Sequence, residues 1–134
     1  MPSVFDASSL TNLVLTRGGK ALDVLRGHYV LDLTIYEIGN ALWRMQKTKT
    51  KLSPTDARSL MKVATYLMSW MNSVSLSELD SVEVLDIAAK ENITFYDAAY
   101  VACAVKRRSV LVTDDDSLAR VASRRVKVSS SSDL

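Results

Sequence analysis

The sequence contains very little cysteine and histidine. Its single cysteine, Cys103, has no partner in the chain, so a disulfide framework and a cysteine zinc site are both excluded. Its single histidine, His28, has no second histidine with which to share a metal, and we expect it to have a structural or surface role. Catalysis by a serine, histidine and aspartate triad is therefore disfavoured, and the cysteine usage suits a reducing cytoplasm.

Long apolar runs, glycine and proline are also scarce. No run approaches the roughly 18 apolar residues of a membrane helix, and the first residues carry no basic and apolar leader. Four glycines, two prolines, 48% apolar and 24% charged residues exclude a collagenous or disordered chain. The net charge of +2 is too small to predict a polybasic nucleic-acid binder. We expect one soluble, cytoplasmic domain over residues 1–134, with 129–134 as a frayed polar tail.

Short apolar strands alternate with amphipathic helices along the whole chain. The expected strands cover residues 4–5, 29–31, 73–76, 110–112 and 126–128. The expected helices cover 8–15, 21–26, 34–45, 54–71, 81–91, 94–108 and 118–123. This alternation predicts an α/β fold with a central parallel sheet of about five strands and helices on both faces.

Acidic residues follow two of the predicted strands. Asp6 follows the first strand, and Asp114, Asp115 and Asp116 follow the strand 110–112. The carboxyl ends of parallel strands meet at one edge of a sheet, which is where ligands bind in such folds. Asp6 is equally compatible with a second role, as the N-cap of the following helix.

Two more acids stand on helices. Asp97 shares a helical face with Tyr100 and other apolar residues, which is unusual for a carboxylate on a surface helix. Glu37 lines up with Asn40 and Arg44 along one side of the helix that begins at Thr34. Thr34-x-x-Glu37 is also a capping-box pattern, and the local pattern alone favours that structural role.

A cluster of carboxylates would repel itself unless a cation lay among its members. Ligands that are all oxygens, with no histidine or cysteine, favour Mg²⁺ or Mn²⁺ over zinc or copper. Two such ions can hold an attacking water and stabilise the leaving oxygen when a phosphodiester is hydrolysed. The sequence also lacks a glycine-rich phosphate loop, which argues against a nucleoside-triphosphatase.

Four motifs together resemble the PIN domain, and most closely the VapC-type toxins of bacteria and archaea. They are Val4-Phe-Asp6-Ala-Ser8, Tyr36-Glu37-Ile-Gly-Asn40, Thr94-Phe-Tyr-Asp97 and Leu111-Val-Thr113-Asp-Asp115-Asp-Ser-Leu118. The resemblance spans essentially the whole chain. It implies a three-layer α/β/α fold and a metal-dependent endoribonuclease that a small VapB-like antitoxin holds inactive.

The resemblance also assigns roles to individual residues. It makes Asp6, Glu37, Asp97 and Asp115 the ligands of Mg²⁺ or Mn²⁺, with Asp115 selected by the family pattern Thr-x-Asp-x-x-Leu. It makes Ser8, Asn40 and Thr113 groups that orient carboxylates or water. Asp114 and Asp116 remain alternatives within the acidic triplet, and Asp116 fits a Thr113-x-x-Asp116 cap equally well.

Basic and apolar surface residues suggest where RNA and a partner would bind. Arg44 is the expected phosphate contact; Lys47, Lys49, Lys51 and 106–108 are weaker candidates, because such residues also complement helix carboxyl ends. Val63, Tyr66 and Trp70 form a second apolar stripe beside the core-facing stripe of their helix. We expect this stripe to contact a second subunit of a homodimer or the antitoxin, although burial within the domain would give the same pattern.

Other functions fit the same pattern less well. A phosphorelay receiver domain also has acids at strand ends, but it would need paired acids after the first strand and a lysine after the fifth. A catalytically silent PIN scaffold or RNA-binding module is also compatible with the sequence, and only an activity test separates it from a nuclease. Within the enzyme class, a housekeeping RNA-processing nuclease is the alternative to a toxin.

Overall fold

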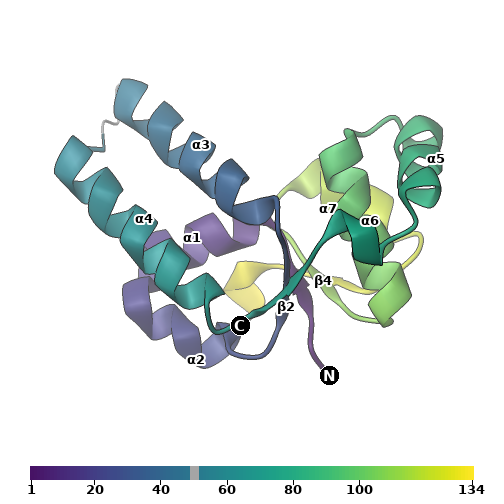
Figure 1. The fold of residues 1–134 in the computed structure, drawn as a ribbon, viewed down its shortest axis with the longest axis horizontal. Coiled ribbons are helices and arrows are strands. Elements are labelled where there is room, and N and C mark those ends of the chain that lie inside the picture. Colours follow the sequence, from purple (N-terminus) through teal and green to yellow (C-terminus); the bar gives the residue numbers. More distant parts are fainter. Residues whose placement is uncertain (49–51) are drawn as a thin grey trace.

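The computed structural model describes residues 1–48 and 52–134, which form a three-layer α/β/α fold (Figure 1). Five strands make one parallel sheet in the order β3-β2-β1-β4-β5. The strands are β1 (Val4–Phe5), β2 (Tyr29–Leu31), β3 (Asn72–Val74), β4 (Leu111–Val112) and β5 (Val128–Ser129). The predicted α/β class and parallel sheet are confirmed. Strand β1 lies at the centre because the chain adds β2 and β3 on one side of it and then crosses over to add β4 and β5 on the other side.

Two sets of helices cover the two faces of the sheet (Figure 1). One face carries α1 (Ala7–Arg17), α2 (Leu22–Leu25), α3 (Thr34–Lys47) and α4 (Pro54–Met68). The other carries α5 (Ser81–Glu91), α6 (Phe95–Arg107) and α7 (Asp116–Ala122). Three 3₁₀ turns, η1 (Gly18–Ala21), η2 (Leu76–Glu78) and η3 (Ser131–Asp133), connect or end these elements.

Successive side chains of the central strands point to opposite faces of the sheet, and this divides the core into two halves. Val4 and Leu111 pack with α5, α6 and α7, whereas Phe5 and Val112 pack with the other helices. This is the two-residue period of a strand that is buried on both faces. The sheet is therefore held from both sides, and its carboxyl edge lies between the two sets of helices.

Local signals fix most helix ends. Asp6, Ser53 and Thr94 accept backbone N–H groups as N-caps of α1, α4 and α6. Helix α1 ends at Gly18, whose φ of 54° is readily adopted only by glycine. The longest expected helix, 54–71, ends earlier than predicted, at Met68, so Trp70 lies beyond α4.

Three smaller expectations differ from the structure. The segment 21–26 is not one helix, because it is divided between η1 and the short helix α2. The third strand ends at Val74, because Ser75 caps the turn η2 instead of continuing the strand. The last strand is Val128–Ser129, later than the expected 126–128.

The carboxyl-terminal residues, which the sequence predicts to be a frayed polar tail, make hydrogen bonds with the rest of the domain. Ser131 donates its backbone N–H to Oδ1 of Asp114 at 2.7 Å, and the Arg17 guanidinium donates to the carbonyl oxygen of Leu134 at 2.6 Å. An acid at the sheet edge thus anchors the segment after β5. The polar composition of the tail gave no sign of this long-range contact.

The two rare residues have structural positions. His28 accepts the backbone N–H of Ser3 through Nδ1 at 2.8 Å and packs edge-on against Phe5. Cys103 is fully buried and unpaired. Within residues 1–48 and 52–134, no helix combines the length and apolar character of a bilayer span. Lys49 and Lys51, two of the weaker phosphate-binding candidates, lie outside the described residues.

Candidate active site

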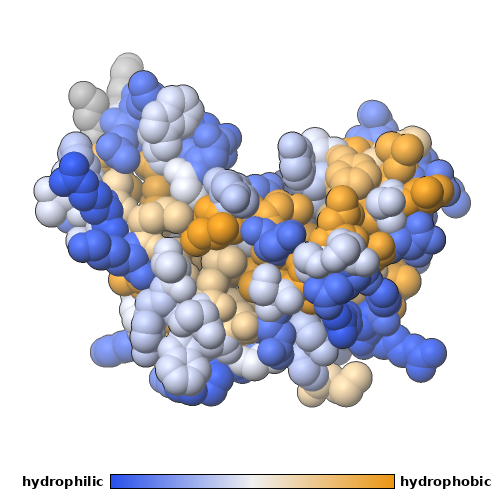
Figure 2. Space-filling model, in the orientation of Figure 1, coloured by the Kyte–Doolittle hydropathy of each residue, from blue (hydrophilic) through white to orange (hydrophobic). Residues whose placement is uncertain are grey.

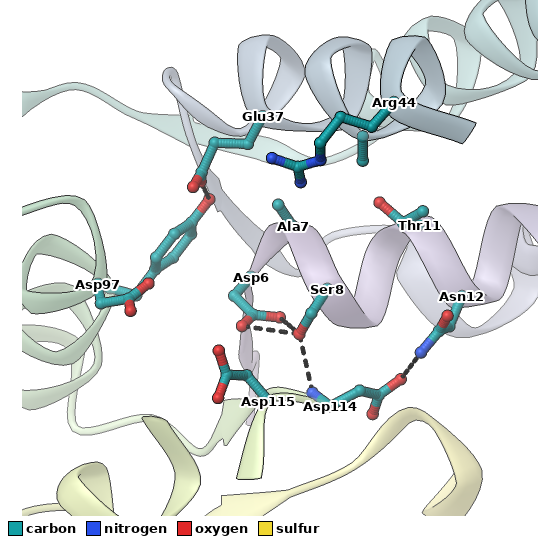
Figure 3. Close-up of a pocket in the computed structure, with 12 residues that line it drawn as sticks. Asp6, Ala7, Ser8, Thr11, Asn12, Glu37, Arg44, Asp97, Asp114 and Asp115 are labelled. Atoms are coloured by element: carbon teal, nitrogen blue, oxygen red, sulfur yellow. Dashed lines mark hydrogen bonds between the residues drawn. The ribbon is translucent and has the colours of Figure 1, made fainter. Parts of the chain in front are cut away.

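A cleft of about 370 Å³ opens at the carboxyl edge of the sheet. Figure 3 shows acids from separate elements around it: Asp6 after β1, Glu37 on α3, Asp97 on α6, and Asp114 and Asp115 after β4. Because β1 pairs with both β2 and β4, the segments that follow these three strands meet here. The remaining lining residues are Ala7, Ser8, Thr11, Asn12, Ala41, Arg44 and Tyr100.

Asp6 is both a helix cap and a cleft residue, so its two proposed positions are compatible. Its Oδ1 accepts the backbone N–H of Ser9 at 2.9 Å and the hydroxyl of Ser8 at 2.8 Å, while Thr113 Oγ1 donates to Oδ2. The side chain is buried, and burial raises its pKa even though these hydrogen bonds oppose the shift. Asp6 is therefore the most firmly held carboxylate of the cleft.

Glu37 does not cap its own helix. The residue preceding α3 is Leu33, and no side chain caps the helix there, so the capping-box interpretation is wrong. Instead, Tyr100 donates its hydroxyl to Glu37 Oε1 at 2.7 Å, and the same hydroxyl lies 2.7 Å from Thr34 Oγ1. Burial, together with the charges of Asp97 and Asp6, raises the pKa of Glu37.

Asp97 lies in the first turn of α6 with its carboxylate in the cleft (Figure 3). The cap of α6 is Thr94, whose hydroxyl accepts the backbone N–H of Asp97 at 3.1 Å. Burial raises the pKa of Asp97, and the nearby charges of Asp115 and Asp6 raise it further. The strand-end acids and Asp97 therefore interact electrostatically although they are far apart in sequence.

The acidic triplet divides into three different environments. Asp115 lines the cleft and caps α7, accepting the backbone N–H groups of Ser117 at 2.9 Å and Leu118 at 3.1 Å. Asp114 also lines the cleft, but Asn12 and Ser131 donate to its carboxylate. Asp116 is not among the lining residues and does not form the expected cap, because Asp115 occupies the cap position.

Of the three residues expected to orient the site, Ser8 and Thr113 contact its carboxylates and Asn40 lies outside the cleft. The Ser8 hydroxyl donates to Asp6 and accepts the backbone N–H of Asp114 at 2.9 Å. Thr113 is buried and connects Asp6 with the backbone N–H of Asp115, which lies 3.1 Å from its Oγ1. Asn40 does not line the cleft; it lines a separate hollow that shares Glu37 with it.

Sequence analysis did not find the supporting role of Tyr100. The residue is buried and contacts Glu37, which is 63 positions away in the chain. One signal was available, because Tyr100 falls three residues after Asp97 on the same helical face. Its partner, however, could not be known before α3 and α6 were placed side by side.

The charge of the cleft is not neutralised by ion pairs. In the described parts of the chain, the salt bridges join Glu78 with Arg107 and Glu91 with Arg124 and Arg125, all outside the cleft. Lys106 and Arg107 both contact Glu78, which agrees with a structural role for that basic segment. Arg44 is the cationic residue that lines the cleft (Figure 3).

The donor set fits a hard divalent ion in its chemistry, since the acids supply only oxygen ligands. Burial raises the pKa of Asp6, Glu37 and Asp97, and neighbouring carboxylates raise those of Glu37 and Asp97 further, whereas hydrogen bonds from Ser117 and Leu118 lower the pKa of Asp115. The carboxylates are not assembled around one point: among residues 1–48 and 52–134, no three acidic, histidine or cysteine side chains are grouped closely enough for one ion. Glu37 is turned to Tyr100, and Asp115 to the end of α7. The assignment of these four acids as ligands therefore stays a prediction, in which Glu37 and Asp115 would turn from these partners toward a shared ion.

Comparison with known proteins agrees with this geometry. Residues 4–124 match the PIN domain. The chain is 35% identical over 109 residues to Exonuclease VapC9 of Pyrobaculum aerophilum, covering 73% of this chain and 77% of that protein. It is 29% identical over 124 residues to Ribonuclease VapC3 of the same organism, covering 89% and 93%.

A solved structure is similar over the full length. The crystal structure of PAE2754 from Pyrobaculum aerophilum has a TM-score of 0.80 and 28% sequence identity, and the alignment covers 100% of this chain and 86% of that chain. Residues 4–124, which match the PIN domain, include all the cleft acids and every strand of the central sheet except β5. The chain belongs to the PIN-domain family and, within it, to the VapC-type proteins.

Proposed function

We propose that this protein is a metal-dependent ribonuclease that hydrolyses phosphodiester bonds of RNA, and that it is the toxin of a toxin-antitoxin pair. One observation carries the proposal: carboxylates from separate elements line one cleft, and no salt bridge among residues 1–48 and 52–134 neutralises them. The nuclease names of the two relatives support the same activity.

Asp6, Glu37, Asp97 and Asp115 would hold Mg²⁺ or Mn²⁺. A bound ion of this kind, or a pair, supplies an activated water and neutralises charge that develops on the phosphate. Among the described residues that line the cleft, Ser8 is the one serine, cysteine or histidine, and its hydroxyl already donates to Asp6. Water is therefore the nucleophile that this set of residues suits.

The remaining lining residues would fix these acids and the substrate. Ser8 and Thr113 hold the Asp6 carboxylate, so that it needs no reorientation when the cation binds. Tyr100 holds Glu37 at the α3 side of the cleft. Arg44 projects from α3 into the same space and would bind a phosphate of the RNA strand.

A VapB-like antitoxin and a second copy of this chain are the partners that the proposed activity requires in the cytoplasm. An unrestrained ribonuclease would damage the cell that makes it. Tyr66 and Trp70 are 50% and 45% exposed, which is a large apolar area to leave in water. A subunit or antitoxin contact is proposed on this surface. Val63, the third residue of the predicted stripe, is partly buried and packs against the core.

The position of cleavage within the strand is a separate question. Our sequence-based proposal is an endonuclease, whereas one relative is named an exonuclease and the other a ribonuclease. An endonuclease would cut linear and circular RNA alike, whereas an exonuclease needs a strand end, so an experiment with both substrates separates the two activities.

The test uses purified protein freed of any partner, with linear and circular single-stranded RNA of the same sequence. We expect cleavage of both with Mn²⁺ or Mg²⁺ and none with EDTA. Cleavage of the linear RNA alone would replace the endonuclease with an exonuclease. Undiminished cleavage in EDTA, or equal cleavage by Asp97→Asn, would overturn the proposed metal-dependent function. The matched control is Asp86→Asn, an exposed acid on α5 outside the cleft.

A further inference from the structure

A second hollow, of about 490 Å³, adjoins the acidic cleft on the surface between α3 and α6. It is lined by Leu33, Tyr36, Glu37, Asn40 and Tyr96, and we call it the aromatic hollow. Glu37 lines both spaces, so the aromatic hollow and the cleft are continuous through one carboxylate. The space-filling view shows the molecule hollowed between α3 and the helices of the opposite face (Figure 2).

Two tyrosines that are not part of the hydrophobic core line this hollow. Tyr36 is 80% exposed and Tyr96 is 59% exposed, although tyrosine usually buries most of its ring in a domain of this size. Each stands one position before a cleft acid, Tyr36 before Glu37 and Tyr96 before Asp97. Successive residues of a helix point about 100° apart, so each ring lies beside its acid and outside the cleft.

The hollow also contains one uncharged polar group. Asn40 lies one helical turn after Tyr36 on α3 and brings a side chain with both hydrogen-bond donors and an acceptor. An aromatic wall with a neighbouring amide matches an unpaired nucleobase, whose flat face stacks on aromatic rings and whose edge exchanges hydrogen bonds with amides. An apolar occupant would cover the Asn40 amide without offering it a hydrogen bond, which costs free energy.

We propose that the aromatic hollow binds an unpaired base of the RNA substrate, next to the phosphodiester held in the acidic cleft. The inference rests on the proposed ribonuclease function and adds a substrate class to it: a single strand whose base near the cleaved bond is free to leave any helix. Tyr36 and Tyr96 supply the stacking faces, and Asn40 contacts the edge of the base. Arg44 and the acids hold the backbone on the other side of Glu37.

Binding is measured by fluorescence anisotropy with labelled single-stranded RNA in EDTA, in an Asp97→Asn background so that no strand is cut. We expect Tyr36→Ala and Tyr96→Ala each to raise Kd by roughly 5- to 150-fold, the range for loss of one base stack. Tyr36→Phe and Tyr96→Phe keep the ring and should stay within about twofold of the parent, because stacking does not need the hydroxyl. The control is Leu85→Ala, a side chain 58% exposed on α5, which should leave Kd unchanged.

A second series identifies the base. In RNAs that each lack one base, the parent protein should lose affinity when one particular nucleotide is abasic, and Tyr36→Ala should show no further loss with that RNA. Equal Kd values for the alanine variants and their parent would overturn the inference. Unchanged RNA binding with weakened binding of a purified protein partner would overturn it as well, since the hollow would then be a protein contact.

The outcomes also separate this inference from the proposed function. If wild-type protein cleaves RNA with Mn²⁺ but the tyrosine variants bind and cleave normally, the base site fails alone. If the tyrosine variants lose RNA affinity but the wild type cleaves nothing, the nuclease function fails while the base site stands.

Discussion

The hydroxyl of Tyr100 donates a 2.7 Å hydrogen bond to Oε1 of Glu37 and connects α6 with α3 at the edge of the cleft. Thr34 Oγ1 lies 2.7 Å from the same hydroxyl, so the tyrosine joins two residues of α3. This contact orients one proposed metal ligand from the helix that carries another, Asp97. This hydrogen bond leads to the first prediction.

Tyr100→Phe should lower the free energy of unfolding of metal-free protein by about 1 to 3 kcal/mol, because two polar groups lose their shared partner. It should also weaken Mn²⁺ binding by roughly 10- to 100-fold, since Glu37 loses the group that orients it. Thermal melts in EDTA and across a Mn²⁺ titration measure both effects. Tyr96→Phe, on the same helix with an exposed ring, is the control. Melts identical to wild type in both conditions would rule out this positioning role.

Asp97→Asn and Asp115→Asn should change metal-free stability in opposite directions. Asp97 is not the N-cap of α6, and burial and like charges raise its pKa although its side-chain hydrogen bond with Thr94 opposes the shift, so the amide should leave the melting temperature unchanged or raise it. Asp115 caps α7 through several hydrogen bonds, so its loss should cost on the order of 1 kcal/mol. Both variants should lose nuclease activity and most of the Mn²⁺ stabilisation, about 2.7 kcal/mol for wild type at a hundredfold excess over Kd. A clearly lower melt of Asp97→Asn in EDTA, with a full response to Mn²⁺, would make Asp97 structural.

The stability difference between Asp97→Asn and wild type should depend on pH in a definite direction. The pKa of Asp97 is raised in the folded protein, so folding favours its protonated form. The unfavourable contribution of the carboxylate is absent below the unfolded pKa of about 3.9 and grows as pH rises toward the folded pKa. Relative to wild type in EDTA, Asp97→Asn should therefore gain stability as the pH is raised from about 4 to 7. Chemical denaturation at several pH values tests this, and a constant difference would contradict the raised pKa.

The wild-type protein should bind Mn²⁺ more tightly as the pH is raised. The pKa values of Asp6, Glu37 and Asp97 are all raised, and a cation competes with the protons that these groups retain in weak acid. Calorimetric titrations should show tighter binding and fewer released protons as pH increases. Affinity that falls with rising pH would exclude these acids as the ligands.

Arg44→Ala should weaken binding of all single-stranded RNAs to a similar extent and reduce the slope of log K against log salt by about 0.7, the loss of one phosphate contact. Arg44→Lys should keep the charge but recover only part of the affinity, because lysine lacks the planar fork of arginine. Lys90→Ala, an exposed cation on α5, is the matched control. A sequence-selective loss for Arg44→Ala would instead indicate a contact with a base.

Trp70→Ser should weaken self-association or antitoxin binding. The indole is 45% exposed and the Arg26 guanidinium lies 4.5 Å from its ring centre, an arrangement that large interfaces commonly bury. Light scattering measures the mass, and titration with purified antitoxin measures affinity. The prediction is abandoned if Trp70→Ser has the mass and the antitoxin affinity of the wild type.

Local sequence patterns determined the fold class and the approximate elements. Short apolar runs between amphipathic segments bury their side chains when they form parallel strands with helices on both faces of the sheet. The structure has this architecture. Ser53 and Thr94 cap α4 and α6 in the structure, because backbone N–H groups at a helix start need partners within a few residues. Acids after β1 and β4 were placed at one edge by the same parallel topology.

Only the tertiary structure decided what the individual acids contact. Glu37 fits a cap in the sequence, yet it turns to a tyrosine on another helix; Asp115, not Asp116, caps α7; and Asp114 fastens the chain end that composition alone suggested would fray. A local pattern specifies which backbone groups require a partner, but several side chains can provide one. The choice among them depends on packing between elements distant in sequence, which sets the burial and the electrostatic surroundings of each carboxylate.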